Sequence, residues 1–177
     1  MARKPIQAAG GIVVRKGRSL GARPLFAVVQ RAKDDRWVLP RGKLKVTERP
    51  KAAARREVFE ETGHHVVVHE FVGAITYRAQ GRPKLVQFWH MAAAVHPSRD
   101  LMRDIAKVAW LPLGKAVKRL SYPLEKLFLQ SVGRGLVRRK RRAALAHRKR
   151  AKTSRKSKRK SKRKSKSVPR AARRKRR

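Results

Sequence analysis

Runs of apolar residues separated by short polar stretches predict β-strands along most of the chain before residue 112. Three short runs precede residue 40. Two longer runs follow residue 65, and Gly81-Arg82-Pro83 between them favours a hairpin. One more short run lies near residue 108. The predicted strands span residues 10–14, 24–30, 36–39, 65–77, 84–95 and 108–111.

One helix is predicted between the two groups of strands, and two more after the last strand. Residues 49–62 carry Pro50 at a first-turn position and are followed by Gly63, a natural helix stop. The later helices are predicted at residues 113–120 and 123–131. The order of strands, helix, strands and helices indicates an α+β (mixed α/β) domain with helices packed on a sheet.

Basic side chains are concentrated towards the C-terminal end. The 177 residues include 51 Lys or Arg and 10 Asp or Glu, a formal net charge of +41, and residues 131–177 carry 25 of the basic side chains and no acid. From Arg138 the sequence becomes strongly basic, and from Ser154 a low-complexity segment of Ser, Lys and Arg offers no apolar surface to offset the entropy of ordering. We therefore predict a folded domain over residues 1–137 and a Lys/Arg-rich tail over residues 138–177 that is disordered when unbound.

The charge of this tail predicts attraction to polyanions. Sequence-independent nucleic-acid binding is one interpretation, and an anionic membrane surface, polyphosphate, the ribosome or no dedicated partner are the others. The chain has no cysteine, no apolar run long enough to span a membrane and no signal-peptide pattern at its N-terminus. We expect a cytoplasmic protein, with nucleoid or nucleic-acid association through the tail.

Four of the ten acidic residues are clustered in and just before the first predicted helix. Glu57, Glu60 and Glu61 share one helical face, and Glu48 lies upstream. Carboxylates this close repel one another unless a cation lies among them, and hard divalent cations such as Mg²⁺ or Mn²⁺ prefer oxygen ligands. The basic residues Arg41, Lys43, Arg55 and Arg56 lie nearby, and the combination indicates phosphoryl chemistry.

The spacing resembles the Nudix box, G-x5-E-x7-R-E-U-x-E-E-x-G-U. Gly42 and Glu48 fill the first two fixed positions, and Arg56-Glu57-Val58-Phe59-Glu60-Glu61-Thr62-Gly63 fills the rest. Every fixed charged and glycine position is matched. The one departure is His64, where the family prefers an aliphatic residue, and we expect a slightly altered helix end there.

The resemblance implies a Nudix fold over roughly residues 5–131, a mixed sheet sandwiched between helices, and cleavage of a nucleoside diphosphate linked to another moiety. It implies a divalent metal, Mg²⁺ or Mn²⁺, held by Gly42, Glu57, Glu60 and Glu61. Glu57 is also the implied base for the attacking water. Arg56 is implied to orient the glutamates, Glu48 to pair within the motif and Gly63 to complete it. The alternative interpretation is a salt-bridged surface helix.

The segment before the helix resembles one subgroup of this family. Trp37-Val38-Leu39-Pro40-Arg41-Gly42-Lys43 is similar to the W-x-x-P-K-G-K segment of a subgroup that contains diadenosine polyphosphate hydrolases, diphosphoinositol polyphosphate phosphohydrolases and a mycobacterial MutT-like type. The favoured substrates are therefore dinucleoside polyphosphates or inositol pyrophosphates. Sanitation of 8-oxo-dGTP and removal of pyrophosphate from RNA 5′ ends are the alternatives. A non-catalytic nucleotide sensor is a further alternative, but it has no need of three intact glutamates.

Substrate contacts are assigned by position and residue type. We expect Arg41 and Lys43 to bind phosphates, and Trp37 or Tyr77 to stack a base. Family members of the MutT type often add a metal-binding carboxylate from a later loop. The candidates for this role are Glu70, Asp100 and Asp104.

Overall fold

The structure is a computed structural model in which residues 4–17 and 23–139 are described. Its contacts divide the chain into the units Met1–Val137 and Arg138–Arg177. The predicted basic tail therefore lies outside the described residues, apart from its first two positions.

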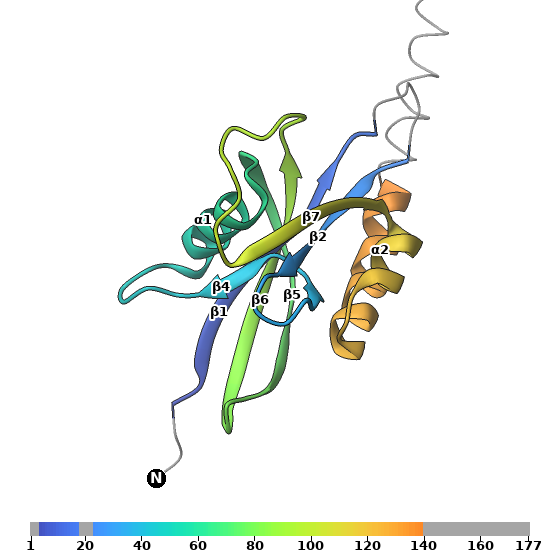
Figure 1. Cartoon of the computed structure of the whole chain (residues 1–177). Helices are drawn as coiled ribbons and strands as arrows, with labels where there is room; N and C mark the ends of the chain where they lie inside the picture. Colours follow the sequence, from blue (N-terminus) through green and yellow to red (C-terminus); the bar gives the residue numbers. More distant parts are fainter. Residues whose placement is uncertain (1–3, 18–22, 140–177) are drawn as a thin grey trace, which may run out of the picture. The chain divides into compact units, whose positions relative to one another are not determined.

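The sheet contains seven strands within the described residues (Figure 1). Its main order is β3-β2-β1-β6-β5, with β4 paired to β1 and β7 to β2. β1 and β6 are parallel, and the other pairs are antiparallel. The strands are β1 (Ile6–Arg15), β2 (Leu25–Arg31), β3 (Trp37–Val38), β4 (Arg41–Lys43), β5 (Val66–Ala79), β6 (Arg82–Ala93) and β7 (Ile105–Pro112).

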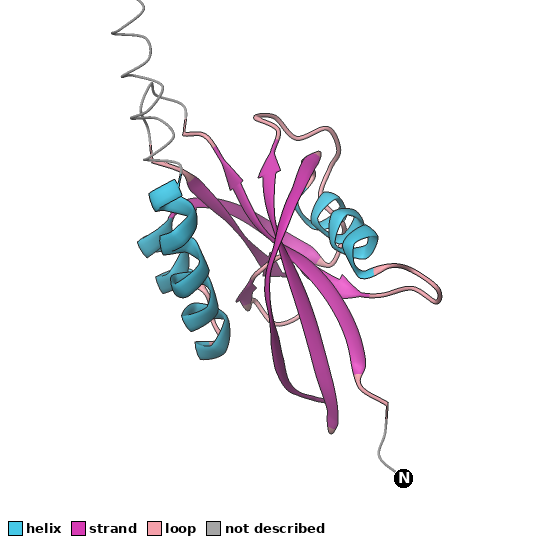
Figure 2. Ribbon diagram, turned by 180° about the vertical axis from the view of Figure 1, so that it is seen from behind, coloured by secondary structure: helices cyan, strands magenta, loops and turns pink. Residues whose placement is uncertain are grey.

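Helices cover both faces of the sheet, as the sequence predicted. Helix α1 (Pro50–Thr62) lies on one face, while α2 (Leu113–Arg119) and a helix over residues 123–139, called the C-terminal helix below, lie on the other (Figures 1 and 2). No helix among the described residues is long and apolar enough to cross a membrane.

Each face of the sheet has its own apolar core. Val58 of α1 and Val13 of β1 belong to one core, whereas Leu129 of the C-terminal helix belongs to the other with Ile12 and Phe88. Successive residues of β1 serve different cores because neighbouring side chains on a strand point to opposite faces. Burial on both sides explains why residues 8–14 of β1 include no polar side chain.

The structure corrects two predicted elements. Residues 41–43, which lie outside the predicted strands, form β4 and pair with β1. Gly10 permits this approach, because a Cβ there would lie 2.2 Å from the carbonyl oxygen of Pro40. The last helix does not end near residue 131 but continues through residue 139, since Leu136 is still buried in the core.

Candidate active site

Helix α1 is followed by Gly63, at a position that favours glycine. Gly63 has a left-handed φ of 72°, and its N–H donates to the Phe59 carbonyl at 2.9 Å. A Cβ at Gly63 would also lie 2.6 Å from the carbonyl oxygen of Arg99. With Val58 buried under the sheet, this helix turns the carboxylates of Glu57 and Glu61 towards β4.

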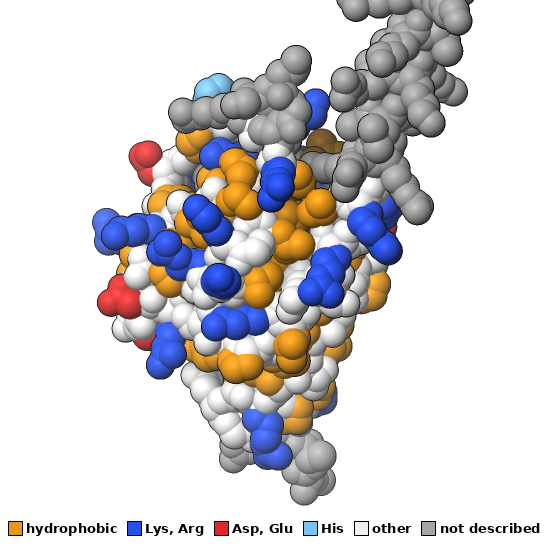
Figure 3. Space-filling view, turned by 90° about the vertical axis from the view of Figure 1, so that its right-hand side faces the viewer, with side chains coloured by type: hydrophobic (Ala, Val, Ile, Leu, Met, Phe, Trp, Pro, Cys, Tyr) orange, Lys and Arg blue, Asp and Glu red, His pale blue; other side chains and the backbone are white. Residues whose placement is uncertain are grey.

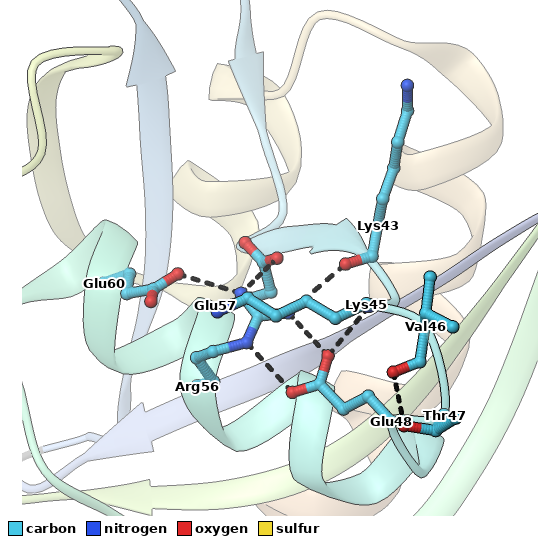
Figure 4. Close-up of polar contacts among 8 residues, drawn as sticks. All are labelled: Lys43, Lys45, Val46, Thr47, Glu48, Arg56, Glu57 and Glu60. Atoms are coloured by element: carbon cyan, nitrogen blue, oxygen red, sulfur yellow. Dashed lines mark hydrogen bonds and ion pairs between the residues drawn. The ribbon is translucent and has the colours of Figure 1, made fainter.

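The Arg56 guanidinium connects three glutamates of the motif (Figure 4). Its Nη1 donates to Glu57 at 2.6 Å and to Glu60 at 3.0 Å. Its Nε and Nη2 donate to the two oxygens of Glu48 at 2.9 and 2.7 Å. The hydrogen bonds from Arg56 are the main cause that lowers the pKa of Glu48 to about 2. Arg56 therefore fixes the direction of each of these carboxylates.

The Glu57 carboxylate lies directly against the backbone of Gly42. A Cβ at Gly42 would be 2.0 Å from the carboxyl carbon and from Oε2 of Glu57. The φ of Gly42 is not in the left-handed region, so glycine is needed here for space and not for conformation. Any larger residue at position 42 would displace the carboxylate.

Glu61 is buried beside this contact. Its Oε2 accepts a hydrogen bond from the backbone N–H of Arg41 at 2.9 Å. Burial raises the pKa of Glu61 to about 8, and the charge of Glu57 adds to the rise. Burial also raises the pKa of Glu57, against the opposing effect of Arg56. Two neighbouring carboxylates whose ionised forms are disfavoured make a place where added positive charge is favourable.

The donor set fits a divalent cation. Its side-chain donors are carboxylate oxygens, the ligands that hard cations prefer. Arg56 donates to both Glu57 and Glu60 and so already balances part of their negative charge. Over residues 4–17 and 23–139, no three metal-ligating side chains converge on one point as they stand. The residues that would hold such a cation are Gly42, Glu57, Glu60 and Glu61.

A family model described as NUDIX domain matches residues 4–131. The chain belongs to the Nudix family. It is 34% identical over 133 residues to the 8-oxo-(d)GTP phosphatase of Mycolicibacterium smegmatis, a match covering 71% of this chain and 40% of that protein. It is 37% identical over 111 residues to a MutT-like protein of Streptomyces ambofaciens, covering 63% of this chain and 66% of that one. The matches thus span less than two thirds of these relatives.

Solved structures of Nudix proteins resemble the chain as well. The crystal structure of a C. elegans Ap4A hydrolase binary complex matches with a TM-score of 0.66 and 25% identity. The match covers 74% of this chain and 97% of that one. The MutT protein of Methanosarcina mazei matches with a TM-score of 0.63 at 20% identity, which concerns the fold alone.

The two predicted phosphate contacts of this Nudix domain, Arg41 and Lys43, lie in different surroundings. The Arg41 side chain is only 8% exposed, and its Nη2 donates to Glu125 at 2.7 Å. Arg41 is thus engaged within the protein instead of being presented to solvent. Lys43 is exposed, and its amine points away from the Arg56 cluster in Figure 4.

The two candidate stacking residues lie on the face of the Nudix sheet that carries the C-terminal helix. Trp37 and Tyr77 are both partly buried against the core of that face. The guanidinium of Arg119 lies 5.0 Å from the centre of the Trp37 ring, and the Nζ of Lys84 lies 5.9 Å from the centre of the Tyr77 ring. Each ring therefore already has a cation as a neighbour.

Lys84 is a candidate substrate-binding residue that the sequence analysis missed. It lies opposite Tyr77 in the β5–β6 hairpin and opposite Ile6 of β1. Burial, followed by the charges of Arg41 and Lys43, lowers the pKa of Lys84 to about 8. The sequence held a usable signal, because a two-residue turn at positions 80 and 81 places residue 84 opposite residue 77.

The three candidates for an additional metal-binding carboxylate lie in different surroundings. The charge of Asp104 contributes to the raised pKa of Glu61. Glu70 lies instead 3.3 Å from Nδ1 of His90, and Asp100 and Asp104 are both exposed. Glu125 was overlooked, although no other acidic residue follows Asp104 in the sequence.

His64, the one departure from the Nudix motif, is buried next to the helix end. Its Nδ1 lies 2.9 Å from the Ala94 carbonyl oxygen, and its ring packs edge-on against Trp110. Burial lowers the pKa of His64, so the neutral ring is favoured. The cap at Gly63 nevertheless has ordinary left-handed geometry.

Proposed function

We propose that the chain is a Nudix pyrophosphohydrolase that depends on a divalent metal, Mg²⁺ or Mn²⁺, and cleaves a nucleoside diphosphate linked to another moiety. The observation that carries this proposal is the packing of the Glu57 carboxylate on Gly42. Beside it lies the buried carboxylate of Glu61. Lys and Arg side chains are spread over the face of the molecule seen in Figure 3. A concentration of acids in so basic a chain has a chemical use at a phosphate-binding site.

Glu57 is the base of the proposed reaction. Water attacks a phosphorus of the anhydride while Glu57 takes its proton, a new P–O bond forms, and the bridging P–O bond breaks with its electrons going to the departing phosphate. A divalent cation held by Gly42, Glu57, Glu60 and Glu61 would neutralise phosphate charge and activate the water. Burial raises the pKa of Glu57, which suits a base because it strengthens the proton affinity of the carboxylate.

Arg56 positions this base. It binds Glu57 and Glu60 through one nitrogen and Glu48 through two others. The Arg56 side chain is therefore fixed at both ends of its planar group, which limits the directions open to the Glu57 carboxylate. We assign Glu48 the role of anchoring Arg56, and Gly63 that of ending α1 immediately after the glutamates.

We propose dinucleoside polyphosphates, or inositol pyrophosphates, as the preferred substrates. The likeness to the C. elegans Ap4A hydrolase over nearly the whole of that chain supports this choice. Lys43 and Lys84 supply positive charge for phosphates that do not react, and the ring of Tyr77 lies next to Lys84. A polyphosphate longer than a diphosphate gives these cations something to bind beyond the cleaved bond.

A second candidate is sanitation of 8-oxo-dGTP. The observation that favours it is the 34% identity to the M. smegmatis 8-oxo-(d)GTP phosphatase. Removal of pyrophosphate from RNA 5′ ends is a third candidate, which the basic residues after position 131 support through their attraction for a long polyanion.

Product analysis of the full-length chain tests these assignments. The panel contains diadenosine tetraphosphate, an inositol pyrophosphate, 8-oxo-dGTP and a triphosphorylated RNA, each with Mg²⁺, with Mn²⁺ and with a chelator. We expect metal-dependent cleavage with a preference for the first two compounds. A preference for 8-oxo-dGTP or RNA would change the assigned substrate but not the assigned reaction.

Substitution of the base tests the chemistry separately. We expect Glu57→Gln to lower kcat by about 100-fold or more, because the general base is lost, while Lys51→Gln on the exposed side of the same helix keeps normal turnover. The folded state should tolerate Glu57→Gln, since burial disfavours the ionised carboxylate that is removed. Wild-type kcat in a folded Glu57→Gln protein would refute the mechanism.

A further inference from the structure

Glu125 is a buried carboxylate on the C-terminal helix, far from α1 in the sequence. The residue is 2% exposed. Burial raises the pKa of Glu125, and the Arg41 guanidinium opposes this rise. A carboxylate removed from water to this extent is tolerated only where its oxygens are hydrogen-bonded.

Both oxygens of Glu125 bind the segment that leads into the Nudix motif. Oε2 accepts the backbone N–H of Leu39 at 2.7 Å, and Oε1 accepts Nη2 of Arg41 at 2.7 Å. A second tether lies close by, where the N–H of Trp37 donates to Oγ of Ser121 at 3.0 Å and the N–H of Ser121 donates to the Trp37 carbonyl at 2.9 Å. The short strands β3 and β4 are thus held from residues 121–125.

The same segment contacts the proposed metal-binding residues on its other side. The N–H of Arg41 donates to Glu61 at 2.9 Å, and the backbone of Gly42 supports the Glu57 carboxylate. Residues 39–42 therefore connect the carboxylates of α1, on one face of the sheet, with Glu125 on the other. A shift of this segment away from Glu125 would change its contacts with Glu57 and Glu61 as well.

Stability alone does not account for the Arg41–Glu125 pair. Buried ion pairs can often be replaced by apolar side chains of similar volume without loss of stability. A carboxylate does something that an apolar side chain does not, because it fixes the Leu39 amide and the Arg41 guanidinium together. Together with the pairing of β4 with β1, these two contacts hold Gly42 in place.

We propose that Glu125 is a positioning residue of the Nudix site. It acts through residues 39–42 to hold Gly42 against Glu57 and Arg41 against Glu61. The proposal rests on the hydrolytic function proposed above, and it assigns part of the site to a helix outside the Nudix motif.

The full-length Glu125→Gln protein tests the proposal. We expect kcat to fall by about tenfold or more and Mn²⁺ affinity, measured by electron paramagnetic resonance, to weaken by a similar factor, as for other supporting residues of metal sites. KM should change by less than about threefold, because Glu125 does not touch the substrate. Glu125→Asp should recover part of kcat by keeping the charge opposite Arg41, and Arg134→Gln on the exposed side of the same helix should behave as wild type.

The double variant Arg41→Met/Glu125→Leu separates positioning from folding. It removes the buried charges together but leaves the Leu39 N–H without its acceptor, so we expect a folded protein with a modestly lowered melting temperature and a kcat as low as that of Glu125→Gln. Wild-type kcat and Mn²⁺ affinity in the folded double variant would overturn the proposal, and so would a raised KM with unchanged kcat, which would make Arg41 a substrate contact. Failure of the wild type to cleave any compound would refute the function instead, while Mn²⁺ affinity would still report on Glu125.

Discussion

At the scale of single residues, the site depends on contacts that leave no room for an added atom. The motif in the sequence identifies Gly42 and Glu57, but it does not say that one lies against the other. That contact arises because β4 crosses the last turns of α1, and the 2.0 Å separation from a built Cβ measures how close the approach is. Arg56 then fixes the carboxylate from the other direction.

Gly42→Ala is predicted to abolish most activity while the domain stays folded. The new Cβ would push the Glu57 carboxylate out of place, and misplacement of a catalytic group by about 1 Å can cost about 100-fold in rate. Steady-state kinetics and thermal melting would measure both effects. Gly114→Ala is the matched control, because nothing lies within 4 Å of a Cβ at Gly114, and it should retain full activity.

Lys84 is predicted to make substrate binding sensitive to alkaline pH. The pKa of Lys84 is lowered to about 8, so the side chain is a cation below that pH and neutral above it. Attraction for phosphate is therefore present at pH 7 and lost as pH rises, and KM should increase about tenfold between pH 7 and pH 9.

Lys84→Arg provides the comparison for this pH profile, since an arginine side chain keeps its charge throughout the range. Its KM should stay nearly constant from pH 7 to pH 9. Parallel profiles for the wild type and Lys84→Arg would contradict a phosphate contact at this position.

At the scale of elements, local signals were enough for α1 and not enough for β4. Pro50 and Gly63 mark the two ends of the helix in the sequence itself, and the structure places its bounds within a residue of the prediction. β4 has only three residues and forms because Gly10 in a distant strand leaves space for Pro40. That requirement is a property of the pair of segments and cannot be read from either one.

Gly63→Ala is predicted to destabilise the domain by about 1–2 kcal/mol, the usual cost of a left-handed conformation for a residue with a Cβ. The close approach of the Arg99 carbonyl oxygen adds to this cost. The free energy of unfolding from urea denaturation would measure it. Gly63→Asn should lose less than Gly63→Ala, because asparagine tolerates the left-handed region better, and an equal loss would assign the effect to crowding alone.

At the scale of the whole molecule, the candidate site draws on parts of the chain that the sequence analysis treated separately. The three glutamates, Arg56 and Gly42 were predicted because the motif keeps them within one stretch. Lys84 and Glu125 were missed because their proximity to the site depends on strand pairing and on docking of the C-terminal helix. The contact of Arg41 with Glu125 has the same origin, and phosphate binding by Arg41 stays a prediction.

The basic residues beyond the described structure are predicted to bind nucleic acid without regard to sequence. Full-length chain and a variant ending at residue 139 would be compared by fluorescence anisotropy with single-stranded RNA over a range of salt concentrations. We expect the affinity of the full chain to fall steeply with salt, because binding releases condensed counterions, and the shorter chain to bind far more weakly. If the RNA affinities of the two chains depended equally on salt concentration, the interaction would be assigned to residues 1–139.

The contacts of Glu125 with Leu39 and Arg41 also have a consequence for the synthesis of the protein. Chains leave the ribosome N-terminus first, and domains can begin to fold during synthesis. A nascent chain exposes every residue of the Nudix motif well before residue 125 is added. If Glu125 positions the site as proposed, such a chain carries all the metal-binding residues and yet lacks the support that makes them effective. Full hydrolytic competence then arises only when the C-terminal helix docks, so truncated translation products that stop before it act weakly on the cell's nucleotides.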